Sequence, residues 1–228
     1  MNGSTARRAV VAAVARRHTR RPVTFLAAVL LAAAAVALAL HAGATGSFAG
    51  YEPRDGDVLF QSLPRSPLVD AIEGVTESPL SHCGIVARGG EEWLVIEAFG
   101  TVRATPLSTW IARGRGGWFA AHRWRDEAAA RVAAFVAAAR ERLGEPYDFA
   151  FELENGSLYC SELVRGAART AFGRDVGRIE RLGELRWQPF AEFLREQAGG
   201  SLPLERQLVT PRSLAEAAEL PRVHPREE

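Results

Sequence analysis

The stretch SHCGIVARGGEEWLVIEAF, residues 81–99, decides the centre of the fold. It holds two runs of mostly apolar residues, 81–88 and 92–99, and each is long enough for a strand. The dipeptide Gly89-Gly90 separates them, and a glycine pair between two such runs is typical of a hairpin turn. The stretch therefore predicts an antiparallel pair of strands.

Polar side chains interrupt both strands of this hairpin. Because successive side chains of a strand point to opposite faces, His82 and Gly84 share one face and Cys83 lies on the other. Gly84 has no side chain, which leaves room beside His82 for another chain or a substrate. Glu97 lies among apolar residues, where a carboxylate is costly unless it has a partner. An imidazole is one suitable partner, and an arginine is another.

A cysteine near the middle of the second half supplies a nucleophile. Cys160 begins a predicted helix over residues 160–170, with Ser157 as its expected N-cap. The positive end of a helix favours the thiolate form. A thiolate, an imidazole such as His82 and a carboxylate that orients the ring form the catalytic group of a cysteine hydrolase. Taken singly, Cys160 and His82 are equally well explained as buried core residues.

The N-terminal part of the sequence predicts export. Residues 1–22 contain six arginines and no acidic residue, and residues 23–44 are almost entirely apolar. This pattern is either a signal peptide or a membrane anchor, and the length of the run slightly favours an uncleaved anchor. A linker over 45–55, one domain over 56–220 and a polar tail over 221–228 follow. The domain is expected outside the cytoplasm, anchored to the membrane or, after cleavage, secreted or periplasmic.

A disulfide between Cys83 and Cys160 is the main alternative to a catalytic site. They are the two cysteines of the chain, and exported proteins commonly pair their cysteines. Strand alternation predicts that Cys83 faces away from Cys160 if His82 faces it. The disulfide and the site therefore exclude each other, and we favour the site.

Strand and helix signals separate along the rest of the chain. We expect further strands at 57–61, 101–106, 118–123 and 207–210, and helices at 68–73, 107–112, 126–143, 190–197 and 211–220. Most strands fall in the first half and most helices in the second. This order predicts an α+β fold, an antiparallel sheet packed against helices, preceded by the N-terminal hydrophobic helix.

The composition of the domain argues against several classes of partner. After residue 44 there are 22 arginines and 27 acidic residues, so the domain lacks the basic surface that a nucleic-acid partner requires. The two cysteines and five histidines show no spacing typical of metal ligands. We therefore expect no nucleic acid, no metal and no cofactor.

Five short motifs resemble the permuted papain-like cysteine hydrolases of the NlpC superfamily, in particular the YiiX/YebB-like branch. They are Gly56-Asp57-Val58-Leu59-Phe60, Ser81-His82-Cys83-Gly84-Ile85-Val86, Val95-Ile96-Glu97-Ala98, Pro146-Tyr147-Asp148 and Tyr159-Cys160-Ser161-Glu162-Leu163-Val164. In ordinary NlpC-type enzymes the cysteine helix comes first. Here it comes last, as in the permuted branch, so the resemblance implies a circularly permuted papain-like fold.

The same resemblance implies roles for individual residues. Cys160 corresponds to the nucleophile, His82 to the general base and Glu97 to the group that orients the imidazole. Tyr147 corresponds to a tyrosine near the oxyanion in the relatives, although it is equally well explained as an aromatic residue packed beside its proline neighbour. Cys83 is a departure, because relatives often have valine or another small apolar residue there.

Together these features predict a peptidase- or amidase-like cysteine hydrolase that cleaves an amide, ester or thioester bond through an acyl-enzyme. Export and the ordinary NlpC-type relatives suggest a cell-wall peptide as the substrate. The predicted anchor and the lipid-acting permuted relatives suggest instead a lipid or lipopeptide, with the acyl group cleaved or transferred at the membrane. A binding module without activity is a third reading, against which the presence of Cys160, His82 and Glu97 argues. An apolar groove near Cys160 would favour the lipid.

Overall fold

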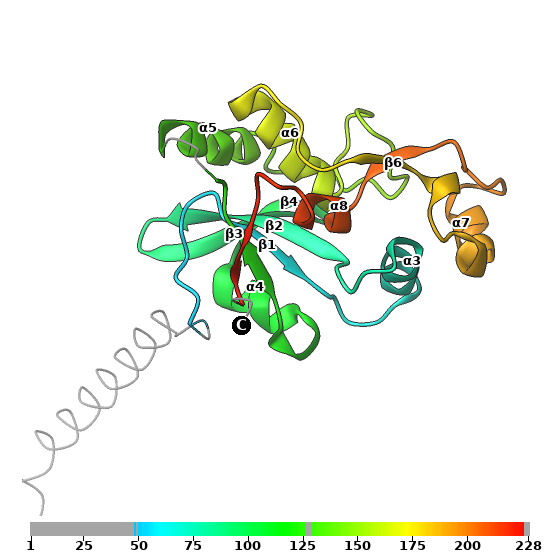
Figure 1. Cartoon of the computed structure of the whole chain (residues 1–228), viewed down its shortest axis with the longest axis horizontal. Coiled ribbons are helices and arrows are strands. Elements are labelled where there is room, and N and C mark those ends of the chain that lie inside the picture. Colours follow the sequence, from blue (N-terminus) through cyan, green and yellow to red (C-terminus); the bar gives the residue numbers. More distant parts are fainter. Residues whose placement is uncertain (1–47, 49, 126–128, 226–228) are drawn as a thin grey trace, which may run out of the picture. The chain divides into compact units, whose positions relative to one another are not determined.

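The computed structural model describes residues 48, 50–125 and 129–225 (Figure 1). The predicted basic flank, 1–22, and the predicted apolar segment, 23–44, lie outside these residues, so the N-terminal hydrophobic helix stays a prediction. Within the described part of the chain, no helix is both long and apolar enough to cross a membrane.

Six strands form one antiparallel sheet in the order β4-β3-β2-β1-β5-β8. Their bounds are β1 (Val58–Gln61), β2 (His82–Gly89), β3 (Glu92–Phe99), β4 (Thr101–Pro106), β5 (Ala120–His122) and β8 (Arg222–His224). The hairpin expected over residues 81–99 is confirmed as β2 and β3, in which Val86 pairs with Val95. On its other side β2 pairs with β1, so the first strand of the hairpin lies inside the sheet.

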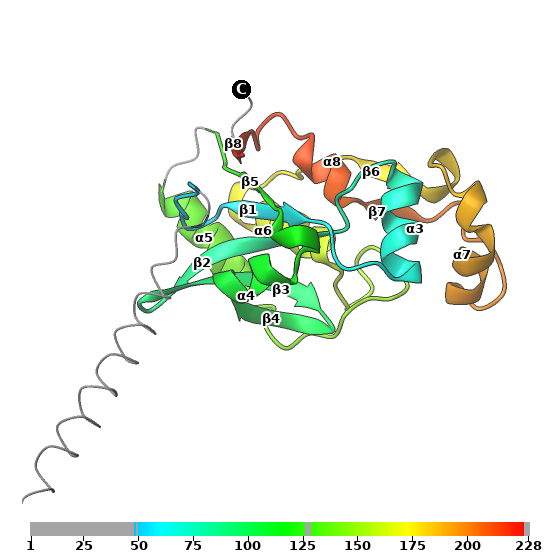
Figure 2. The same ribbon diagram turned by 90° about the horizontal axis from the view of Figure 1, so that it is seen from below.

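Helices cover both faces of this sheet. α5 (Ala129–Arg140) and α6 (Cys160–Phe172) pack on one face, and α4 (Leu107–Arg113) packs on the other (Figure 1 and Figure 2). The buried apolar residues form two clusters, one on each face. Cys83 and Ile85 belong to the cluster that contains α6, whereas Val86 belongs to the cluster that contains Trp110 of α4. The alternation predicted for the strand is therefore confirmed.

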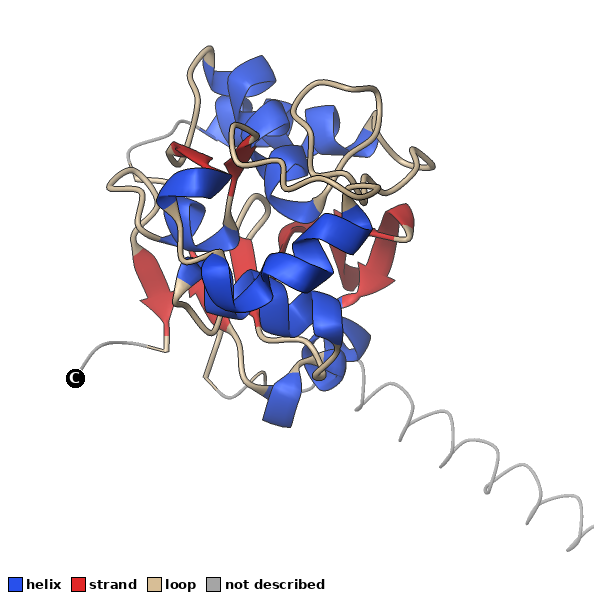
Figure 3. Ribbon diagram, turned by 90° about the vertical axis from the view of Figure 1, so that its right-hand side faces the viewer, coloured by secondary structure: helices blue, strands red, loops and turns tan. Residues whose placement is uncertain are grey.

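Residues 179–215 form a smaller region next to α3 (Pro67–Thr76). It contains α7 (Ala191–Gln197), which packs against α3, and α8 (Pro211–Ala215), which packs against α6. It also contains a two-stranded sheet of β6 (Ile179–Arg181) and β7 (Gln207–Val209), separate from the six-stranded sheet (Figure 3). Short 3-10 helices at Arg115–Gly117, Leu182–Glu184 and Gln188–Phe190 complete the elements.

The predicted α+β class and most elements agree with the structure, with differences at several ends. The expected strand over 118–123 shortens to Ala120–His122, and the expected last helix over 211–220 ends at Ala215. The helix expected over 126–143 ends at Arg140, and residues 126–128 are not described. β6 and β8 have no expected counterpart, and β8 lies within the stretch expected to be a polar tail. Both are three residues long, too short to show a periodic pattern.

Gly84 is required by the close approach of two strands. A Cβ atom at this position would lie 2.5 Å from Cγ1 of Val95 and 3.0 Å from the carbonyl oxygen of Ile96. The space beside His82 that the sequence predicts is therefore filled by β3 of the same sheet. This approach brings the backbone of Glu97 next to the strand that begins with His82.

Candidate active site

Cys160 is the first residue of α6, and its neighbours on both sides are fixed to β7. The hydroxyl of Tyr159 accepts a hydrogen bond from the Val209 N–H at 3.0 Å, and the Ser161 hydroxyl donates to the Val209 carbonyl at 2.8 Å. The N-cap is Tyr159, in an extended conformation and without a side-chain cap, so the expected Ser157 cap is wrong. The helix starts two residues later than that cap requires, because Tyr159 is bound to β7 instead.

His82 is held by Glu97 on the neighbouring strand. The imidazole Nε2 and the Glu97 Oε2 are 2.6 Å apart, and both side chains are buried. A proton on Nε2 that is donated to this carboxylate leaves Nδ1 for a second partner. Cys160 lies beside the ring and raises the pKa of His82, so its thiol is the candidate for that second partner. The three residues predicted for catalysis are therefore brought together.

Glu97 is fully buried and has three further partners that the sequence analysis did not identify. Thr105 donates to Oε1 at 2.6 Å, and the Nε of Arg103 lies 3.4 Å from the same oxygen. The Nη2 of Arg113, from α4, donates to Oε2. Both expected partners of the carboxylate, an imidazole and an arginine, are thus present at once.

The register of β3 and β4 places Arg103 directly opposite Glu97. A hairpin predicted over these two strands could therefore have identified Arg103 as a partner of Glu97.

Charges in this cluster favour an ion pair between the imidazolium and the thiolate. Burial works against the charged ring, but hydrogen bonds and charge from Cys160 and Glu97 outweigh it and raise the pKa of His82 to about 9. Burial also opposes the Glu97 carboxylate, yet His82, Arg113 and Thr105 lower its pKa to about 2. The buried carboxylate therefore stays ionised and keeps the ring protonated when the thiol ionises.

Cys83 contacts Cys160, and the prediction that it faces away is wrong. The thiol and the backbone N–H of Cys83 lie close enough to the Cys160 sulfur to lower its pKa, and both thiols are free. The cause is that α6 packs on the face of β2 that carries Cys83. His82, on the opposite face, still reaches the sulfur because it is the first residue of β2 and lies at the end of the strand. Contact with Cys83 therefore does not exclude the catalytic pair.

The two thiols have opposite ionisation behaviour. The pKa of Cys160 lies well below its usual range, chiefly because the Cys83 thiol hydrogen-bonds to its sulfur and secondarily because His82 lies beside it, although burial opposes this. Burial, followed by the contact with Cys160, raises the pKa of Cys83. Cys160 is thus the thiolate of the pair, and Cys83 is a neutral hydrogen-bond donor to it.

Tyr147 lies in the same cluster, half-buried and close to the nucleophile. Burial and then the negative charge of Cys160 raise its pKa well above the usual value, so its hydroxyl keeps its proton. Its ring packs against Phe149 and Phe151, with centroids 4.8 Å and 6.1 Å away. The structure therefore brings the predicted oxyanion candidate to the site as a neutral donor, and its role stays a prediction.

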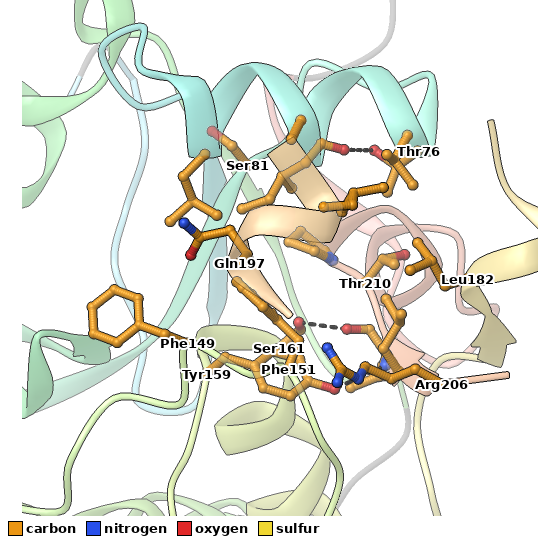
Figure 4. A pocket seen from close by; sticks show the side chains of 18 of the residues that line it. Thr76, Ser81, Phe149, Phe151, Tyr159, Ser161, Leu182, Gln197, Arg206 and Thr210 are labelled. Carbon is orange, nitrogen blue, oxygen red and sulfur yellow. Dashed lines mark hydrogen bonds between the residues drawn. The ribbon is translucent and has the colours of Figure 1, made fainter. Parts of the chain in front are cut away.

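An apolar pocket leads to Cys160, and we call it the α3–α7 pocket (Figure 4). Its walls include α3, α7, the start of α6 and residues of the 203–211 segment, which contains β7. Representative lining residues are Ala71, Ile72, Val75, Phe193, Leu194 and Leu208. Among the described residues that line it, Arg206 is the one charged side chain, and it is paired with Glu152 at 2.9 Å. No local sequence pattern predicts this pocket, because its walls are far apart in the chain.

Comparisons with known proteins identify a family and two relatives. A family model described as a permuted papain-like amidase enzyme, YaeF/YiiX, matches residues 52–224. The uncharacterized protein YiiX of Escherichia coli is 34% identical over 173 residues, 75% of this chain and 85% of that protein. A crystal structure described as metalloprotein YiiX, also from Escherichia coli, matches with a TM-score of 0.72 and 34% identity. That match covers 76% of this chain and 97% of the crystallised one.

The described residues of the present chain do not fit a metal site. Over 48, 50–125 and 129–225, no group of three or more histidine, cysteine, aspartate or glutamate side chains is arranged to hold a metal ion. The carboxylate that binds His82, that of Glu97, is also bound by Thr105 and two arginines. The roles proposed below therefore belong to side chains and backbone groups.

The order of the elements also agrees with the resemblance found in the sequence. β1, the strand with His82 and the strand with Glu97 all precede the helix that begins with Cys160. The family match spans most of the chain, and YiiX shares both sequence and fold with it. This chain belongs to the permuted papain-like amidase family of YaeF and YiiX.

Proposed function

We propose that this protein is a cysteine hydrolase that cleaves a long-chain acyl group from an amide, ester or thioester. Cys160 is the nucleophile, His82 the general base and Glu97 the group that orients the ring. The observation that carries this proposal is the contact of Cys160 with both a buried His82–Glu97 pair and an apolar pocket. The lining of the α3–α7 pocket favours an apolar acyl chain over the hydrophilic cell-wall peptide that export alone suggests.

The reaction proceeds through an acyl-enzyme. His82 Nδ1 holds the proton taken from Cys160, and the thiolate attacks the carbonyl carbon of the substrate. The backbone N–H of Cys160, at the start of α6, and the Tyr147 hydroxyl donate hydrogen bonds to the oxyanion. Collapse of this intermediate expels the leaving group, which takes the proton from His82. A water that gives its proton back to His82 then attacks the thioester and releases the carboxylic acid.

The membrane anchor remains part of the proposal. An uncleaved segment over residues 23–44 would hold the catalytic domain next to acyl lipids outside the cytoplasm, and a cleaved one would release it. This expectation lies outside the described residues, and the lipid substrate does not depend on it.

Activity on acyl substrates of different length tests the proposal. The purified protein is assayed with chromogenic acyl esters from two to sixteen carbons, and with a muropeptide mixture. We expect kcat/KM to rise with chain length, no turnover of muropeptides, and loss of activity in Cys160→Ala and His82→Ala. Turnover of muropeptides with none of the acyl esters would contradict the lipid assignment. Full activity in Cys160→Ala would contradict the nucleophile.

Filling the pocket tests where the chain binds. Ala71 lines the α3–α7 pocket, whereas Ala112 is exposed on α4 and lines none of the pockets described. We expect Ala71→Leu to move the preferred chain length to shorter acyl groups, because the added methyl groups occupy the pocket. Ala112→Leu is the matched control and leaves the preference unchanged. An identical length profile in both variants would show that the acyl chain binds elsewhere.

A further inference from the structure

A second pocket, next to the α3–α7 pocket, adjoins the catalytic histidine. We call it the His82 pocket. Its lining includes His82, Arg113, Arg65, Phe99 and Tyr147. It shares Leu68, Ile72, Ser81 and Phe149 with the α3–α7 pocket, so the two adjoin along α3. Cys160 lines only the first pocket, and His82 lines only the second.

This division assigns the two halves of a substrate. In the proposed reaction the acyl group becomes attached to the Cys160 sulfur, so it occupies the pocket that this sulfur lines. The leaving group takes its proton from the imidazole, so its departing atom must lie within hydrogen-bond reach of His82. The leaving group therefore occupies the His82 pocket.

The lining of the His82 pocket carries a net positive charge. Among the described residues that line it are two arginines and no aspartate or glutamate. Arg65 is largely exposed and paired with Asp70 at 2.9 Å, so its charge is mostly compensated. The Arg113 side chain is only 18% exposed, and its guanidinium lies over the ring of Phe99, 4.3 Å from the ring centroid. It is the arginine whose charge can act on a bound group.

Glu97 does not compensate Arg113 fully. The single carboxylate is shared by Arg113, by Arg103 and by His82, which is itself protonated when the leaving group departs. Within the described part of the chain, Glu97 is the one hydrogen-bond partner of Arg113, whose Nε atom is buried without a partner. A guanidinium has five N–H donors, so Arg113 retains donors for an anion.

We propose that the His82 pocket binds the leaving group of the substrate and selects one that carries an anion, a carboxylate or a phosphate. The proposal rests on the proposed function, because it needs acyl transfer to Cys160. The substrate class is then an acyl amide or acyl ester with two unlike ends, an apolar chain in the α3–α7 pocket and an anionic head group beside Arg113. Binding of the head group by Arg113 adds no chemical step to the reaction.

The test compares substrates that share one acyl chain. The three amides are N-palmitoylglycine, N-palmitoylglycinamide and N-palmitoylethylenediamine, whose leaving amines are anionic, neutral and cationic. N-palmitoylphosphoethanolamine and N-palmitoylethanolamine form a second pair that separates phosphate from carboxylate. We expect the anionic member to exceed the neutral one in kcat/KM by roughly tenfold, and the cationic one to be the poorest.

Variants show whether Arg113 is the cause of the preference. Because Arg113 also touches Glu97, the readout is the ratio of kcat/KM between anionic and neutral substrates, which a general loss of activity does not change. We expect the ratio to fall to about one in Arg113→Gln and to be retained in Arg113→Lys. Arg206→Gln is the matched control, since it removes an arginine from the α3–α7 pocket and should keep the ratio. A preference that survives in Arg113→Gln, or its absence in the native protein, would overturn the proposal.

Binding to the inactive Cys160→Ala variant distinguishes failure of the proposed hydrolysis from failure of the proposed anionic site. Tighter binding of N-palmitoylglycine than of N-palmitoylglycinamide, without turnover by the native protein, would support the anionic site and reject the proposed hydrolysis. Turnover of all the amides at equal rates would support the hydrolysis and reject the anionic site. Neither binding nor turnover of any of them would reject both.

Discussion

The two halves of the active site are built by different means. The His82 half is a cluster of side chains on neighbouring strands, in which one buried carboxylate binds an imidazole, a hydroxyl and two arginines. The Cys160 half is positioned through its chain neighbours Tyr159 and Ser161, which are fixed to the backbone of β7. The first half sets the charge of the site and the second sets the position of the sulfur. Substitutions should therefore affect chemistry in one half and geometry in the other.

The largest effect is expected from removing the negative charge of Glu97 in the His82 half. Glu97→Gln leaves His82 without an anion and two arginines without their acceptor. We expect kcat/KM to fall at least roughly 100-fold and the free energy of unfolding to fall by about 3 kcal/mol or more. Steady-state kinetics and urea unfolding measure the two quantities. Glu73→Gln, which breaks a half-exposed pair with Arg115, is the control and should leave kcat/KM nearly unchanged.

Raising the pH removes the positive charge of His82 without a mutation. The imidazolium is needed to protonate the leaving group, so kcat/KM should fall about tenfold for each pH unit above about 9, where His82 loses its proton. A kcat/KM that stays flat to pH 10.5 would contradict the raised pKa of His82.

Stability follows from the same two pKa values, with opposite signs. The pKa of His82 is raised in the folded protein, so its contribution is complete below pH 6.5 and is lost as the pH rises through about 9. The pKa of Glu97 is lowered, so its contribution is complete above pH 4.5 and is lost as the pH falls through about 2. Urea unfolding should therefore show both contributions in full between pH 4.5 and 6.5. His82→Gln should flatten the alkaline decline.

Cys83 links the two halves, and its removal should have an intermediate effect. Cys83→Ala removes the thiol that lowers the pKa of Cys160, so this pKa should rise. Alkylation of Cys160 by iodoacetamide at pH 6 should then be slower by roughly several-fold, because less thiolate is present. Cys83→Ser keeps a donor and should alkylate at a rate close to that of the native protein. Equal rates in Cys83→Ala and the native protein would show that the contact does not stabilise the thiolate.

The smallest effect is expected on the geometric half. Tyr159→Phe removes the acceptor of the buried Val209 N–H, which should lower the free energy of unfolding by about 1–3 kcal/mol. The pH dependence of kcat/KM should stay unchanged, because the charges are intact. Ser157→Ala is the control and should not alter stability, since Ser157 does not cap α6. A shift of the pH profile of kcat/KM in Tyr159→Phe would contradict the assignment of charge to one half and geometry to the other.

The sequence was most informative in the β2–β3 hairpin, where the strand alternation and two of the predicted catalytic residues lie close together in the chain. The isolated charge of Glu97 predicted a buried partner and left an imidazole and an arginine open, and the family resemblance then assigned His82. The hairpin turn fixes the register that brings the two residues together. The position of α6 was not available from the chain, since helix placement depends on long-range packing. For that reason the contact between Cys83 and Cys160 was predicted wrongly, although both faces of β2 were assigned correctly.

The same reasoning explains what the sequence could not show about substrate. The α3–α7 pocket joins residues from α3, α7 and the segment 203–211, and no local period connects them. Arg113 sits on a short helix with no sign that its side chain reaches Glu97. Three-residue strands such as β6 and β8 pair through tertiary contacts that no short pattern encodes.

The grouping of Glu97 with its partners has a consequence for how the protein is made. All four of them, from His82 to Arg113, leave the ribosome before Cys160 does, and the contacts among them span neighbouring strands and the helix that follows. The bonds of the Glu97 carboxylate therefore involve no residue from Cys160 onward. Since the low pKa of Cys160 depends on Cys83 and His82, a nascent or unfolded chain carries an ordinary thiol, and reactivity arises only when α6 docks.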